Sequence, residues 1–122
     1  MIPTFLLIDD DTCMHRLLDA FLQRRFSSGY QLISAHDLND GIEWLKSAAA
    51  AYDAIFLDSR LPPFRDATET LPLVKDAAPD ARVFVISADT GDDAFAENIG
   101  PMADGFLDKF ALGDEIRNGL VG

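Results

Sequence analysis

Short apolar runs alternate with helical patterns along the whole of this 122-residue chain. The apolar runs have the length of buried strands rather than of helices. They predict strands at Phe5–Ile8, Tyr30–Ser34, Ala54–Leu57, Val83–Ile86 and Gly105–Leu107. Strands that alternate with helices are typical of an α/β domain with a parallel sheet, so we expect that fold class here.

The connections between these strands carry apolar residues at spacings of three and four, which is the pattern of one helical face. The stripes consist of Met14, Leu17, Leu18, Phe21 and Leu22, then Leu38, Ile42, Leu45 and Ala49, then Ala94, Phe95 and Ile99, and finally Ile116 and Leu120. We expect Gly100-Pro101 to end the third of these helices, and the last helix to run from about Gly113 to Val121.

The connection after the third strand is less regular, because Pro72 interrupts it. Proline is tolerated in the first turn of a helix but not in its interior. We therefore expect an extended loop after Asp58, followed by a short helix that begins near Leu71 or Pro72.

Composition narrows the class of protein. The chain has the size of one domain, residues 1–122, and its net charge of −11 argues against nucleic acid or an anionic membrane as a direct partner. No apolar stretch approaches the length of a membrane span, and no basic leader opens the chain. The lone Cys13 excludes an internal disulfide and fits a reducing cytoplasm, and its neighbours suggest that it packs in the core.

Polar residues follow four of the five predicted strands. Asp9, Asp10 and Asp11 stand behind the first, and Asp58, Ser87 and Lys109 behind the third, fourth and fifth. Each has a structural explanation of its own, and the three aspartates could simply be solvated residues that cap the next helix. Together, however, they would converge at the carboxyl edge of a parallel sheet, where ligands of α/β domains bind.

The chemistry of this set favours phosphoryl transfer. Carboxylates around one point suit Mg²⁺, and a lysine opposite the metal adds a second positive charge. A phosphoryl group could lie between the two, and an aspartate could take it up as an acyl phosphate. No cysteine or histidine cluster suggests zinc, since His15 and His36 are isolated and expected on the surface, and no glycine-rich phosphate loop is present.

The chain resembles the receiver domains of bacterial two-component response regulators over about Thr4 to Leu120. The resemblance rests on LLIDDDTCMHRLL, YDAIFLDSRLPP, VFVISAD and ADGFLDKF, in receiver-like order and spacing. It implies a flavodoxin-like (βα)5 doubly wound domain with a five-stranded parallel sheet of order 2-1-3-4-5.

The resemblance also implies roles for the acidic residues. Asp58 matches the phosphoacceptor. Asp9 and Asp10 match the acidic pair that binds Mg²⁺, with Asp10 as the direct ligand and Asp9 acting largely through water. The backbone carbonyl of Arg60 would complete the metal ligands, and Asp11 would start the helix.

Three further residues match the phosphoryl-sensing and switch positions of the family. Ser87 and Lys109 match the hydroxyl and the lysine that sense the phosphoryl group, and Phe106 matches the aromatic residue that changes rotamer. Receivers usually have proline after the lysine, in a cis peptide, but Phe110 stands here. A cis bond before a non-proline residue costs about 2.5–4 kcal/mol, so we expect a trans Lys109–Phe110 bond.

The implied function is a stand-alone receiver, although the chain could also be one domain of a larger protein. It would accept a phosphoryl group from a sensor histidine kinase or a histidine phosphotransfer protein. It would then change its surface around the fourth helix, fifth strand and fifth helix and so alter a contact with a downstream protein target. Such a protein is a signalling module of the cytoplasm and catalyses only its own phosphorylation and dephosphorylation.

Two alternatives remain open at this point. One is a Mg²⁺-dependent phosphohydrolase with an aspartyl-phosphate intermediate, but such enzymes typically need a second acid where this chain has Arg60. The other is a receiver-like binding module that acts without phosphorylation.

Arg60 and Asp89 match variable receiver positions that control the access of water to the acyl phosphate. We expect them to line the mouth of the site, where they could pair across the entrance or simply both point into solvent.

Overall fold

The computed structural model describes residues 2–48, 52–64, 67–87 and 103–121 and shows one parallel sheet. The strands are β1 (Thr4–Ile8), β2 (Gln31–Ala35), β3 (Ala54–Asp58), β4 (Arg82–Ser87) and β5 (Gly105–Asp108). Their order is β2-β1-β3-β4-β5, as predicted. Each strand begins and ends within one residue of its predicted bounds.

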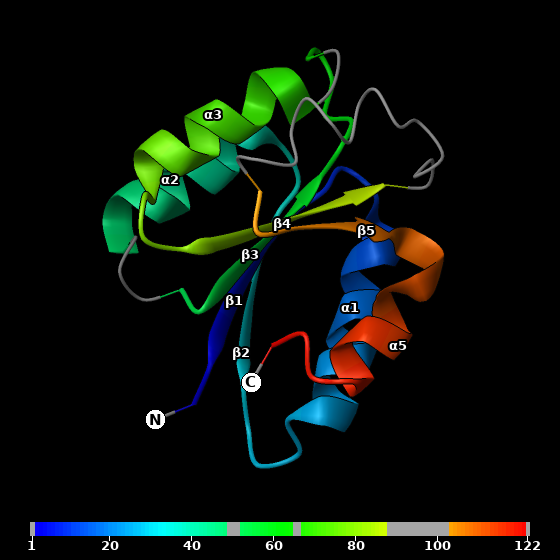
Figure 1. The fold of residues 1–122 in the computed structure, drawn as a ribbon. Coiled ribbons are helices and arrows are strands. Elements are labelled where there is room, and N and C mark those ends of the chain that lie inside the picture. Colours follow the sequence, from blue (N-terminus) through cyan, green and yellow to red (C-terminus); the bar gives the residue numbers. More distant parts are fainter. Residues whose placement is uncertain (1, 49–51, 65–66, 88–102, 122) are drawn as a thin grey trace.

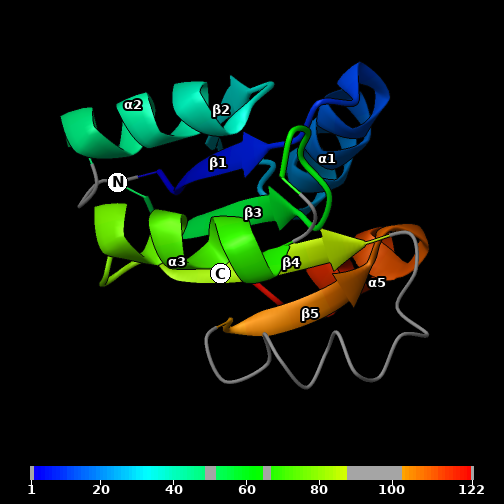
Figure 2. The ribbon, with the colours of Figure 1, turned by 90° about the horizontal axis from the view of Figure 1, so that it is seen from above.

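Helices cover both faces of this sheet. Helices α2 (Leu38–Ala48) and α3 (Ala67–Ala77) lie side by side on one face, and α1 (Thr12–Arg25) and α5 (Leu112–Arg117) lie on the other (Figures 1 and 2). A short 3₁₀ helix, η2 (Lys109–Ala111), joins β5 to α5. This doubly wound arrangement confirms the predicted fold class.

The alternation of side chains along each strand builds two separate cores. In β1, Leu6 and Ile8 pack in the cluster that includes residues of α2 and α3, whereas Phe5 and Leu7 pack with residues of α1 and α5. All four side chains are buried. Burying one large apolar side chain stabilises the fold by roughly 1.5–3 kcal/mol, so strand β1 is held firmly on both faces.

The start of α3 differs from the prediction. The helix begins at Ala67, so Pro72 lies inside it rather than in its first turn. Ala67, Leu71 and Val74 are buried at helical spacing. Their packing against the sheet outweighs the backbone hydrogen bond that the proline cannot make.

The end of α5 also differs. The helix stops at Arg117 instead of continuing to Val121, because Gly119 takes a positive φ of 97°. The Leu120 N–H donates to the Glu115 carbonyl and the Gly119 N–H to the Ile116 carbonyl, which is a Schellman motif. The predicted helix around Ala94, Phe95 and Ile99 falls outside the described residues.

Candidate functional site

Parallel strands bring their carboxyl ends to one edge of the sheet, and the predicted site residues meet there. Asp9 follows β1, Asp58 and Ser87 are the last residues of β3 and β4, and Lys109 follows β5. Asp58 pairs with Ile86, the neighbour of Ser87, and Ser87 pairs with Asp108, the neighbour of Lys109. The strand register therefore places Asp58, Ser87 and Lys109 at neighbouring positions along the carboxyl edge of the sheet.

Three carboxylates form the centre of this site. Asp9, Asp10 and Asp58 each present a carboxylate oxygen, and these oxygens all lie within 4.8 Å of one another. Asp9 and Asp58 are buried, whereas Asp10 is exposed. Like charges this close repel one another, and the burial of Asp9 and Asp58 strengthens the repulsion, so the site favours a bound cation.

Asp11 does not join this cluster as a ligand. It is the N-cap residue of α1, where its Oδ1 accepts a hydrogen bond of 2.9 Å from the Cys13 N–H. The Asp11 N–H in turn donates to Asp9 Oδ1 at 2.8 Å, so the cap also fixes one oxygen of Asp9. The interpretation of Asp11 as the start of the helix is confirmed.

The ammonium of Lys109 partly balances the two buried carboxylates. Its Nζ lies 3.4 Å from Asp9 Oδ2 and 3.3 Å from Asp58 Oδ1. Burial alone would lower the pKa of Lys109, but the charges of Asp58 and Asp9 outweigh it and the pKa is raised. The lysine therefore stays charged and places a positive charge beside Asp58.

The lysine does not neutralise Asp58 completely. The pKa of the Asp58 carboxyl is raised to about 7, first because burial penalises its charged form and then because of the Asp9 charge. Lys109 and the N–H of Arg60, 3.4 Å from Asp58 Oδ1, act in the opposite direction. A buried carboxylate at this pKa gains from any further positive charge placed beside it.

The donor set fits Mg²⁺. Asp9 Oδ2 is a buried oxygen without a hydrogen-bond donor, and its nearest cation is the Lys109 ammonium at 3.4 Å. An oxygen in this condition is a ready ligand, directly or through water. Carboxylate oxygens with one exposed member, Asp10, match the preference of Mg²⁺ for oxygen ligands and retained waters.

The structure adds His15 to the site, which the sequence interpretation had placed on the surface. His15 is buried, and its Nε2 donates to the backbone carbonyl of Asp9 at 2.8 Å. Its ring stacks on that of the exposed His36, with centroids 4.3 Å apart. Cys13 was also misplaced, since it is exposed rather than packed in the core. In the sequence, only the position of Cys13 and His15 at the start of α1, directly after the acidic residues, could have indicated that they lie near the site.

The turn after β5 explains how Lys109 is held without a following proline. Among the described residues only Pro62–Pro63 is cis, so the predicted trans Lys109–Phe110 bond is confirmed. The Phe110 N–H donates to Asp108 Oδ1 at 2.8 Å, a hydrogen bond that proline could not form. The Phe110 ring itself is 86% exposed.

The remaining predicted residues lie around this centre. Ser87 is buried at the end of β4, Phe106 is half-buried in β5, and Arg60 is exposed in the loop after β3. Asp89 falls outside the described residues, so the pairing of Arg60 with Asp89 remains a prediction.

Comparison with known proteins identifies this arrangement. A family model for the response regulator receiver domain matches residues 5–120. The chain belongs to this family. It is a phosphoacceptor receiver of two-component signalling with an acidic pocket at Asp9, Asp10 and Asp58, and a signalling module rather than an enzyme. The phosphohydrolase alternative is therefore set aside.

Several solved structures are similar to this receiver. A response regulator from Burkholderia pseudomallei, solved with a phosphorylated aspartic acid, a calcium ion and citrate, is 27% identical, with a TM-score of 0.79 over 98% of this chain and 66% of that chain. A receiver domain protein from Clostridium thermocellum is 17% identical, with a TM-score of 0.76 over 96% and 93%.

The CheX–CheY–BeF3–Mg complex from Borrelia burgdorferi contains a third similar chain, 21% identical, with a TM-score of 0.78 over 98% of this chain and 90% of that one. The last two similarities support the fold alone. Among curated protein sequences no match is found. Within the described part of this receiver, no helix has the length and apolar character needed to cross a membrane.

Proposed function

We propose that Asp58 is the phosphoacceptor of this receiver. The observation that carries the assignment is the position of its carboxylate, 3.3 Å from the Lys109 ammonium and clustered with the carboxylates of Asp9 and Asp10. This is the arrangement in which a nucleophilic carboxylate is flanked by one cation and by the ligands for a second. The phosphorylated aspartic acid of the Burkholderia pseudomallei regulator supports the same chemistry.

The donor is a phosphohistidine on a sensor histidine kinase or a histidine phosphotransfer protein. A carboxylate oxygen of Asp58 attacks phosphorus, and a P–O bond forms while the P–N bond breaks. The electron pair of the broken bond returns to the imidazole nitrogen of the donor. Only the ionised carboxylate is nucleophilic. Because the pKa of Asp58 is raised to about 7, the site must supply positive charge that favours this ionised form.

The residues that would hold Mg²⁺ are Asp10 directly, Asp9 largely through water, Asp58, and the backbone carbonyl of Arg60. When bound, the metal supplies positive charge that favours the ionised carboxylate and offsets the charge of the incoming phosphoryl oxygens. The buried Asp9 Oδ2 without a hydrogen-bond donor supports this assignment. The similar complex from Borrelia burgdorferi contains magnesium, but at 21% identity it supports only the fold of this chain.

Lys109 and Ser87 bind the phosphoryl group once it is on Asp58. The Lys109 ammonium exchanges its contact with the Asp58 carboxylate for one with a phosphoryl oxygen, and the Ser87 hydroxyl donates to another. Phe106, which packs against the core cluster beneath α2 and α3, changes rotamer in response. Such a change would alter the surface around β5 and α5.

That surface binds a downstream protein target. Residues 1–122 act as one receiver domain, and the protein works in the cytoplasm. The CheX–CheY–BeF3–Mg complex from Borrelia burgdorferi, which contains a chain of this fold, is an example of such a chain in a protein assembly. The net charge of −11 disfavours nucleic acid and anionic membranes as partners. The unpaired thiol of Cys13 agrees with a reducing compartment.

The deciding experiment is to incubate the protein with Mg²⁺ and acetyl phosphate and to look for an acid-stable, base-labile adduct. Asp58→Asn should abolish the adduct and leave the fold intact. Asp76→Asn removes an exposed carboxylate in α3 and should label like the wild type. Stoichiometric labelling of Asp58→Asn would refute the assignment, and an unlabelled wild type would favour the phosphorylation-independent binding module.

A further inference from the structure

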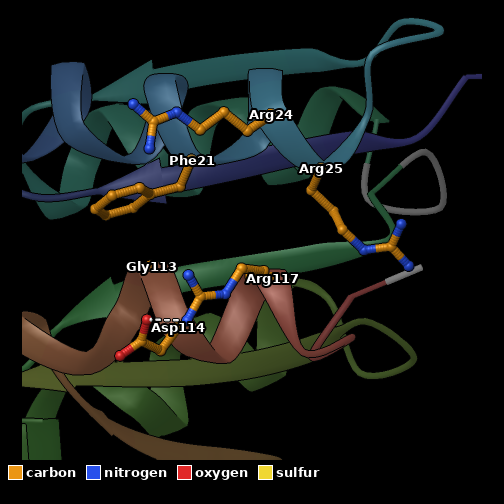
Figure 3. Close-up of a pocket in the computed structure, with 6 residues that line it drawn as sticks. All are labelled: Phe21, Arg24, Arg25, Gly113, Asp114 and Arg117. Atoms are coloured by element: carbon orange, nitrogen blue, oxygen red, sulfur yellow. Dashed lines mark hydrogen bonds and ion pairs between the residues drawn. The ribbon is translucent and has the colours of Figure 1, made fainter.

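A second pocket opens between α1 and α5, on the helices that cover one face of the sheet. Its volume is about 420 Å³. None of the acidic-site residues lines it, and Figure 3 shows its walls. The lining residues are Phe21, Arg24, Arg25, Gly113, Asp114 and Arg117. The pocket is therefore separate from the phosphorylation site and has a composition of its own.

The charge of this pocket opposes that of the whole protein. Three of the ten basic side chains of a chain whose net charge is −11 line it, and two of them, Arg24 and Arg117, place their guanidinium groups together, whereas Asp114 is the only acidic residue among the lining residues that the structure describes. Arg117 pairs with Asp114 at 2.6 Å, whereas Arg24 is exposed and has no ion-pair partner among the described residues. A local excess of positive charge in a concave site selects an anion.

The ring of Phe21 forms an apolar wall of the same pocket. It lies so close to the backbone of α5 that a Cβ atom at Gly113 would meet the ring at 2.8 Å. Figure 3 shows the guanidinium groups of Arg24 and Arg117 on the same side as this ring, one from each helix, while Arg25 extends the other way. The glycine therefore lets the two helices place an aromatic ring next to two guanidinium groups.

We propose that this pocket binds a nucleotide. Guanidinium groups recognise phosphate oxygens through paired hydrogen bonds, and a phenyl ring offers a face on which a base can pack. Pockets for ligands of this size have volumes of roughly 300–1,000 Å³. A bare phosphate would leave the Phe21 wall uncovered, and an extended acidic peptide would need a groove longer than this pocket.

The ion pair between Arg117 and Asp114 is part of the binding step. Both side chains are largely exposed, at 75% and 67%, so the pair is weak and can exchange. A phosphate that binds Arg117 displaces the Asp114 carboxylate into solvent. The carboxylate thus competes with the ligand, and its removal strengthens binding.

The test is a calorimetric titration of the full chain with ADP at low salt, with EDTA present so that no metal carries the nucleotide to the acidic site. ADP should bind, and the affinity should weaken as salt is added. Arg24→Ala and Arg117→Ala should each weaken it about tenfold, the effect of one lost hydrogen bond to a charged group. Arg16→Ala, an exposed arginine of α1 outside the pocket, should leave it unchanged.

Two further variants distinguish the parts of the pocket. Phe21→Leu should weaken ADP and leave the binding of inorganic phosphate unchanged, and Asp114→Asn should tighten ADP. The proposal is overturned if ADP gives no heat up to millimolar concentration, or if Arg24→Ala and Arg117→Ala bind it like Arg16→Ala. It is also overturned if inorganic phosphate or a glutamate-rich peptide binds as tightly as ADP.

Discussion

The ammonium of Lys109 lies 3.3 Å from Oδ1 of Asp58, yet the pKa of that carboxyl is still raised to about 7. One lysine between two buried carboxylates, Asp9 and Asp58, balances only part of their charge. The metal-free site is therefore destabilised when Asp58 ionises, so the stability of the fold depends on pH.

Without metal, the free energy of unfolding should fall as the pH rises from about 4 to about 7. The Asp58 carboxyl has an ordinary pKa of 3.8 in the unfolded chain and about 7 in the fold. Between these values the folded state binds the extra proton, so raising the pH removes stability. Urea unfolding in EDTA across this range measures it. Asp58→Asn should flatten the dependence of the free energy of unfolding on pH. An equally steep dependence in that variant would show that the raised pKa does not belong to Asp58.

Mg²⁺ should raise the melting temperature, because it binds the folded carboxylate cluster and not the unfolded chain. At a concentration of 100 times its Kd, a ligand of this kind adds about 2.7 kcal/mol to the free energy of unfolding. Thermal scans with and without Mg²⁺ measure the shift, which EDTA should reverse.

A matched pair of variants tests the site of this effect. Asp10→Asn should reduce the shift. Asp11→Asn removes a neighbouring charge but keeps a good N-cap, so it should retain the shift. Equal shifts in the two variants would show that Mg²⁺ acts elsewhere.

His15 should support the acidic site through the backbone of Asp9. His15→Phe keeps a ring that can stack on His36 but removes the donor to the Asp9 carbonyl, which lies 2.8 Å from Nε2. Leaving a buried carbonyl without its donor costs about 1–3 kcal/mol, and a less fixed Asp9 should also bind Mg²⁺ more weakly. Denaturant unfolding and Mg²⁺ titration measure the two effects.

The control for this prediction is His36→Phe, which changes the exposed partner of the stack and leaves the buried hydrogen bond in place. It should behave nearly like the wild type in both measurements. If His15→Phe does so too, the histidine has no role in positioning Asp9.

The sheet and the acidic centre could be predicted from the sequence because both follow from simple periodicities. Apolar runs such as Phe5–Ile8 mark strands that are buried on both faces. In a parallel sheet their carboxyl ends share one edge, so residues as distant as Asp9, Asp58 and Lys109 had to meet. Residue type and position at a strand end were sufficient.

Features that depend on tertiary packing were not predictable in the same way. The start of α3 depends on how well Ala67 and Leu71 pack on the sheet, and that gain overrides the local cost of Pro72. The burial of His15 depends on a backbone carbonyl that faces it, and a sequence does not display backbone partners. The end of α5 is different, since Gly119 carried a signal for a left-handed cap that the prediction did not use.

Pro72 should therefore cost stability that can be recovered. Inside a helix, proline is about 3 kcal/mol less favourable than alanine. The greater freedom of the unfolded chain offsets about 0.4–1 kcal/mol of this, so Pro72→Ala should raise the free energy of unfolding by about 2 kcal/mol. Pro79→Ala, beyond the end of α3, removes only chain stiffness and should be slightly destabilising. Destabilisation by Pro72→Ala would mean that the helix depends on the proline.

Arg60 should slow the loss of phosphate from Asp58. Its backbone N–H lies 3.4 Å from Asp58 Oδ1, so its exposed side chain starts directly beside the acceptor. An arginine that covers the mouth of the site obstructs the in-line approach of water to the acyl phosphate. Arg60→Ala should then dephosphorylate severalfold faster, as followed by the decay of the labelled protein after the donor is removed.

The cause of that protection can be separated with one more pair of variants. Arg60→Met keeps the length of the side chain without its charge, so it should decay slowly if bulk alone excludes water. If the arginine must be fixed by a carboxylate, Arg60→Met should decay like Arg60→Ala, and Asp89→Ala should be faster than the wild type but slower than Arg60→Ala. A surface ion pair of this kind contributes only about 0–1 kcal/mol to stability, so the melting temperatures should hardly change. Unchanged or slower decay in Arg60→Ala would show that the side chain points into solvent and leaves the path of water open.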